Sequence, residues 1–79
     1  MKKPVYVDLH TLTEDQRIDM IGHAAMDHNK AIAFVVEDKH KANRYVAKLK
    51  DKFPGIVELM RFPLAGQVAV KVGPPVHTN

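Results

Sequence analysis

The residues best suited to do chemistry are the basic side chains of residues 38–52. This stretch holds six basic residues against two acidic ones, a local balance of +4 in a chain whose net charge is +3. Most of them recur three or four positions apart, so on a helix they share one side. Each cation there can neutralise a backbone phosphate. We therefore predict a nucleic-acid-binding face, with RNA as the expected ligand, formed by Lys39, Lys41, Arg44, Lys48 and Lys52.

A second interpretation of these basic residues stays open. Long lysine side chains commonly solvate the outer side of a packed helix without binding anything. Aromatic side chains that could stack on bases are also scarce, because Tyr45 falls on the expected buried stripe of the same helix and only Tyr6 is an obvious candidate. The pattern predicts nucleic-acid binding but is also typical of a solvated surface.

Asp19, His23 and Asp27 form a second group with chemical potential. They are spaced four residues apart, so on a helix they share a face and could offer two or three metal ligands. The same spacing is typical of an acidic solvated helix, and the surrounding residues match no metal-binding motif. We therefore predict no metal site.

Several classes of enzyme are excluded by what the sequence lacks. It contains no cysteine, hence no thiolate nucleophile, no disulfide and no zinc site built on sulfur. Its four glycines are scattered and form no phosphate-binding loop. No histidine has an identifiable partner for acid–base chemistry. We predict a non-enzymatic binding module without a cofactor.

The elements that position the basic residues begin with an apolar run at residues 31–36. A strand that is apolar at every position predicts a central place in a sheet, paired on both sides. A helix follows, between an N-cap at Asp38 and a stop at Pro54 and Gly55. Its predicted buried stripe consists of Ala42, Tyr45, Val46, Leu49 and Phe53.

Four further elements complete the expected fold. Thr13 and Gln16 form a capping-box pattern at the start of a helix over residues 14–28. Alternating apolar residues predict a first strand at 4–9, and residues 56–62 and 67–72 are expected to form an antiparallel hairpin.

The order of these elements is β-α-β-α-β-β, which predicts an α/β (α+β) two-layer sandwich. Strands separated by a helix are normally parallel, so we expect a four-stranded mixed sheet with both helices on one face. The favoured strand order is 1-2-4-3, and 1-2-3-4 is the alternative. The uncovered face must be partly wet or used by a partner.

Length and composition predict one domain over residues 1–79, with an ordered core at about 4–73 and a flexible tail at 74–79. We find no apolar segment long enough to be a leader or to span a membrane. Together with the absence of cysteine, this predicts a cytoplasmic protein. The oligomeric state stays open.

The element order resembles the C-terminal domain of bacterial translation initiation factor three. In that domain the last hairpin carries Phe-Pro, then Gly and Gln at its turn, then an apolar strand that ends near a proline. The matching residues here are Phe62, Pro63, Gly66, Gln67 and Pro74, and the turn is shorter. The resemblance implies an RNA-binding module, in agreement with the basic helix.

The same pattern is similar to the TusA-like sulfur-carrier family. Asp8, Leu9 and Leu12 match that family's spacing, but Glu14 and Asp15 stand where its Cys-Pro would begin the helix. A carboxylate cannot carry a persulfide. The resemblance therefore implies a relative that has lost sulfur transfer.

Three functions are thus predicted for this chain. The leading one is nucleic-acid binding through the basic helix. The alternatives are a protein-interaction or inhibitory accessory protein that docks by its open sheet face or an edge strand, and a TusA-like relative without sulfur-transfer activity.

Overall fold

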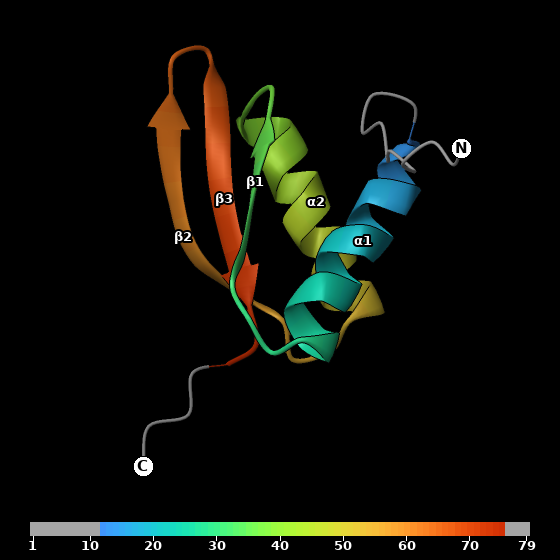
Figure 1. The fold of residues 1–79 in the computed structure, drawn as a ribbon. Helices are drawn as coiled ribbons and strands as arrows, with labels where there is room; N and C mark the ends of the chain where they lie inside the picture. The colour runs from blue at the N-terminus through green and yellow to red at the C-terminus, as the bar shows by residue number, and fades with distance from the viewer. Residues whose placement is uncertain (1–11, 76–79) are drawn as a thin grey trace, which may run out of the picture.

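The computed structural model describes residues 12–75, which contain two helices and three strands (Figure 1). In chain order these are α1 (Glu14–Asp27), β1 (Ile32–Val36), α2 (Lys39–Lys52), β2 (Val57–Leu64) and β3 (Gln67–Gly73). Each lies within two residues of an element predicted from the sequence. The predicted strand at 4–9 and most of the predicted tail lie outside the described residues.

The sheet differs from the predicted one. Within residues 12–75 it has three strands in the order β1-β3-β2, and both strand pairs are antiparallel. The prediction of a four-stranded mixed sheet is therefore wrong: β3 lies between β1 and β2 and is antiparallel to both, so the described sheet contains no parallel pair. Among the described residues β1 pairs on one side only, with β3, which is the central strand of this sheet, and the predicted pairing of β1 with a strand at 4–9 lies outside them.

β1 is apolar at every position for a reason other than the predicted burial between two strands. Ile32, Phe34 and Val36 pair with valines of β3 and face the helices, where they pack on or belong to the core. Ala33 and Val35 point to the opposite face, and Val35 is 49% exposed. An uninterrupted apolar strand here means one buried face and one apolar face open to solvent.

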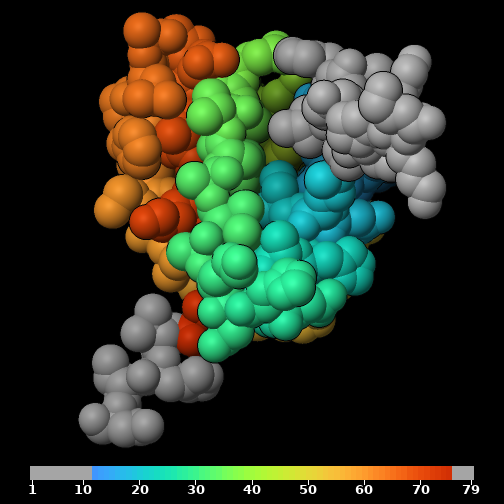
Figure 2. Space-filling view, in the orientation of Figure 1, coloured from blue at the N-terminus to red at the C-terminus, as the bar shows by residue number. Residues whose placement is uncertain are grey.

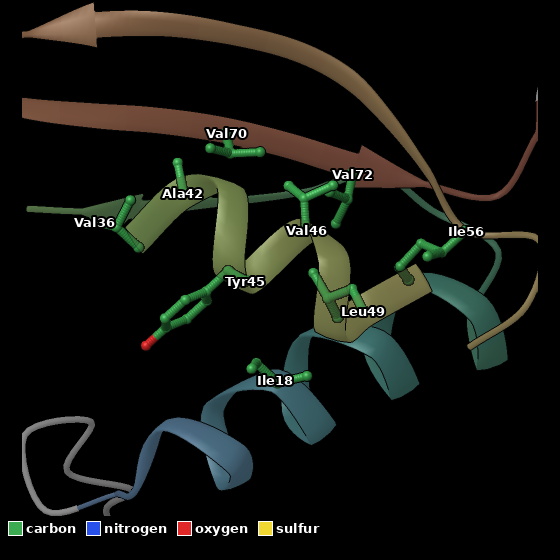
Figure 3. Close-up of a cluster of buried hydrophobic side chains, with 10 residues drawn as sticks. Ile18, Val36, Ala42, Tyr45, Val46, Leu49, Ile56, Val70 and Val72 are labelled. Atoms are coloured by element: carbon green, nitrogen blue, oxygen red, sulfur yellow. The ribbon is translucent and has the colours of Figure 1, made fainter. Parts of the chain in front are cut away.

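Both helices lie on the same face of the sheet, and each contacts β1 and β3 as well as the other helix (Figures 1 and 3). Ala42 and Val46 point toward Val70 and Val72 of β3, while Tyr45 and Leu49 turn toward α1 (Figure 3). Ile18 of α1, which is fully buried, closes this side of the core. The predicted buried stripe of α2 thus packs against both the sheet and α1.

The two helices begin at caps that the sequence predicts. Thr13 Oγ1 accepts a hydrogen bond from the Gln16 N–H at 3.1 Å, and the Thr13 N–H donates to Gln16 Oε1 at 2.9 Å. Asp38 Oδ1 accepts from the Lys41 N–H at 2.8 Å. These bonds satisfy backbone donors that have no partner inside the helix.

The hairpin of β2 and β3 turns at Ala65 and Gly66, and Gly66 adopts a φ of 72°, which favours glycine. β2 contains a bulge between Glu58 and Met60 and a proline, Pro63. Both features are typical of edge strands. Neither helix in residues 12–75 has the length and apolar character needed to cross a lipid bilayer.

Candidate interaction surfaces

The basic side of α2 faces an acidic side of α1. Arg44 Nε and Nη2 donate to Glu14 Oε2 and Oε1 at 2.8 and 2.7 Å, a bidentate pair. Lys48 Nζ lies 3.0 Å from Glu14 Oε2 and 3.3 Å from Asp15 Oδ1. Lys52 Nζ lies 3.0 Å from Asp19 Oδ1. The two helices are therefore joined by a ladder of ion pairs, and they run in the same direction.

The remaining predicted phosphate ligands lie at the start of α2. Lys41 Nζ donates to Glu37 Oε1 at 2.9 Å. Lys39 is exposed, and residues 12–75 offer it no carboxylate partner. Four of the five predicted residues thus have their charge matched by carboxylates of the same chain. Lys39 in the first turn of α2 and Lys50 in its last turn are exposed cations for which residues 12–75 show no such partner.

The ion pairs also shift the acidity of the groups that form them. The hydrogen bond from the Arg44 guanidinium, helped by Lys48, lowers the pKa of Glu14 to about 2. The same contact raises the pKa of Arg44, and hydrogen bonds to Glu14 and Asp15 raise the pKa of Lys48. Glu14 is therefore ionised throughout the neutral range and holds two cations of α2.

The three residues considered as metal ligands do not converge. Asp19 is bound to Lys52, while His23 Nδ1 lies 3.1 Å from Asp27 Oδ2. The His23 ring also packs edge-on against Phe53, with the ring centroids 5.0 Å apart. In the described part of the chain, no group of three or more His, Cys, Asp or Glu side chains is arranged to hold a metal ion.

The face of the sheet opposite the helices is apolar. Because side chains alternate along a strand, the register places one set of residues on this face, which we call the open sheet face. Val35 of β1 and Phe62 of β2 flank Ala69 of β3, and the bulge adds Leu59, which lies against Gly73. The open sheet face comprises Ala33, Val35, Leu59, Met60, Phe62, Leu64, Gln67, Ala69 and Lys71.

The large side chains on this face are exposed to solvent. Val35 is 49% exposed, Met60 53%, Phe62 42%, Leu64 43% and Leu59 38%. An antiparallel sheet with one wet face normally alternates apolar with polar residues, so five exposed apolar side chains on one face depart from that rule. The sequence predicted an uncovered sheet face but did not identify these residues, although the alternation within 57–64 carried the signal.

A groove of about 730 Å³ runs beside the edge of β1 that pairs with no strand of residues 12–75. It is lined mainly by apolar side chains of α1, including Met20, Ile21 and Ala24, and by β1 and Tyr45. Figure 2 shows β1 at the surface between the hairpin of β2 and β3 and α1. This edge is a second surface at which a partner can reach the sheet, but it offers only five residues of strand.

Comparison of the chain with protein-family models, with curated proteins and with solved structures gives no match. The resemblances to the initiation-factor domain and to the TusA-like carriers stay predictions.

Proposed function

We propose that this chain is a protein-interaction module that binds another protein through the open sheet face. The observation that carries the proposal is the group of five large apolar side chains, each 38% exposed or more, on a single face of the sheet. Scattered exposed apolar residues are normal on any protein, whereas a contiguous apolar patch is often a binding surface.

The composition of the face supports the same proposal. The centres of protein interfaces are depleted in charged residues and enriched in aromatic residues and methionine. The open sheet face carries Phe62 and Met60 on β2 and a single charged residue, Lys71, on β3. A partner that covers it would remove from water the side chains that contribute most to binding energy.

Nucleic-acid binding through α2 stays a prediction, and the ion pairs weaken the case for it. A phosphate that approaches Arg44, Lys48 or Lys52 must compete with carboxylates already 2.7–3.3 Å away. The favourable release of counterions expected from an unpaired cation is reduced where the charge is already matched.

The proposal is tested by capture of partners from a cell lysate, divided into nuclease-treated and untreated halves. Three baits are compared: the wild type, an open-face variant (Val35→Thr with Phe62→Gln) and a matched cation variant (Lys39→Gln with Lys50→Gln). The cation variant changes two exposed residues without breaking an ion pair seen in the structure. Captured proteins are identified by mass spectrometry, and their affinity is measured with purified components.

We expect a protein that resists nuclease, binds the wild type and the cation variant equally, and is lost with the open-face variant. The proposal fails if no captured protein depends on Val35 and Phe62. Capture of nucleic acid that falls with the cation variant would instead favour the function predicted from the basic helix.

A further inference from the structure

Lys71 is an unusual residue for the place it occupies. It lies on β3, the central strand, opposite Ala33 of β1 and Met60 of β2. The side chain is half-buried among these apolar neighbours, and residues 12–75 provide it with no ion-pair partner. On the free protein its ammonium group can still reach water along the flexible stem.

A partner that covers the open sheet face would remove this water. An ammonium group buried without a counter-charge is strongly unfavourable, and a carboxylate at hydrogen-bond distance offsets much of that cost. The open sheet face itself contains no carboxylate, since its other members are apolar residues and Gln67. Since residues 12–75 supply none, we infer that the compensating charge comes from the partner.

The same argument disfavours a second copy of this chain as the partner. Two copies stacked face to face would bury two Lys71 side chains in one interface, to which neither open sheet face brings a carboxylate. Like charges without a counter-charge lower the stability of such an interface.

We propose that the open sheet face binds an amphipathic helix of another protein, with a carboxylate inside the apolar stripe of that helix pairing with Lys71. This inference rests on the proposed function. Neighbouring strands lie about 4.8 Å apart and a helix with its side chains is about 10 Å across, so one helix can cover the central strand and reach Val35 and Phe62 on either side. A stripe of leucines would contact these residues, and one Glu near its centre would reach Lys71.

The test uses two synthetic helical peptides of identical composition and net charge. Both carry a leucine stripe; in the first, one Glu lies at the centre of the stripe and one Gln on the opposite side, and in the second these two residues are exchanged. Binding to the wild type and to Lys71→Met is measured by fluorescence anisotropy. The methionine keeps the apolar stem, and a thermal unfolding curve checks that the variant folds. Lys71→Gln serves as a second variant.

The wild type should bind the first peptide roughly tenfold more tightly than the second, as for a charge pair desolvated in an interface. Both variants should lose this preference, and Lys71→Met should bind the first peptide more weakly than the second, because its central Glu would be buried without a counter-charge. The preference of the wild type should shrink as salt is added. Equal affinities for the wild type, a preference retained without Lys71, or no binding of either peptide would overturn the inference. If that happens while partner capture still depends on Val35 and Phe62, the proposed function stands and only the partner chemistry is wrong.

Discussion

Glu14 joins the two helices, and its replacement by glutamine tests how much that junction contributes to stability. Glu14 accepts two hydrogen bonds from Arg44 and one from Lys48. Glu14→Gln keeps the size of the side chain and its helix propensity but removes the negative charge. It also leaves both cations of α2 without this partner, and it removes an acidic residue from the first turn of α1, where the helix dipole favours one.

The size of the effect follows from the pKa of Glu14. A fall from 4.5 to about 2 sets an upper limit of about 3.4 kcal/mol, since each pKa unit is worth about 1.36 kcal/mol. The Glu14 side chain is 25% exposed and its two partners are 40–49% exposed, so water screens these pairs. Exposed pairs contribute about 0.2–1 kcal/mol each. We therefore expect Glu14→Gln to lower the free energy of unfolding at pH 7 by about 1 kcal/mol.

The same charge predicts a specific dependence on pH. Because folding lowers the pKa of this carboxyl, its contribution is present above the unfolded pKa near 4.5 and is lost as the pH falls toward 2. The difference in the free energy of unfolding between wild type and Glu14→Gln should thus be complete at pH 7, shrink as the pH falls below about 4.5, and be nearly absent at about pH 2. Added salt at pH 7 should reduce this difference in stability, because it screens the ion pairs.

Urea unfolding followed by circular dichroism measures the free energy of unfolding of wild type and Glu14→Gln at each pH. Asp27→Asn is the matched control, because it removes a carboxylate from the same helix in an exposed pair with His23, and it should change stability by less than about 0.5 kcal/mol. An equal effect of Glu14→Gln at pH 7 and pH 2, or no effect at pH 7, would refute the role assigned to the ion pairs.

Four other substitutions give outcomes that unfolding curves can check. Leu49→Ala, at a fully buried position, should lower the free energy of unfolding by about 2–5 kcal/mol through the cavity it leaves. Gly22→Ala should destabilise the protein by about 1–3 kcal/mol, because a Cβ at residue 22 would come within 2.0 Å of the Phe53 ring. A gain in the free energy of unfolding would contradict this packing. Thr13→Ala should cost about 1 kcal/mol by removing the cap of α1. Phe62→Gln should leave stability within about 0.5 kcal/mol, since Phe62 is 42% exposed, and a larger loss would assign it to the core.

The helices could be predicted from the sequence because their signals are local. Thr13 and Asp38 precede runs with helical periodicity, and the hydrogen bonds of both caps are present in the structure. The stripe that begins at Ala42 and includes Leu49 is buried as its spacing predicts. In each case the evidence lies within one or two turns of chain.

The sheet and the charge pairing could not be predicted in the same way, because both depend on which elements become neighbours. Apolar residues at every position of 31–36 do not say which face a helix covers, and Val35 shows that one face stays open. The sequence shows the cations of α2 but does not show that carboxylates of α1 pair with them. Asp15 and Asp19 repeat at the same four-residue interval as Lys48 and Lys52, so a matching acidic side was visible in the sequence, but only the packing of the helices made the two sides meet.

Pro63 and the bulge in β2 have a consequence for how this protein behaves at high concentration. A strand edge with a proline and an irregular register is a poor template for another strand, so growth of the sheet by repeated strand addition is hindered on that side. The apolar open sheet face, in contrast, is covered by a partner that packs on it and not by an added strand. One bound partner occupies the whole face. Association through this molecule should therefore stop at complexes of fixed size and not continue into fibres.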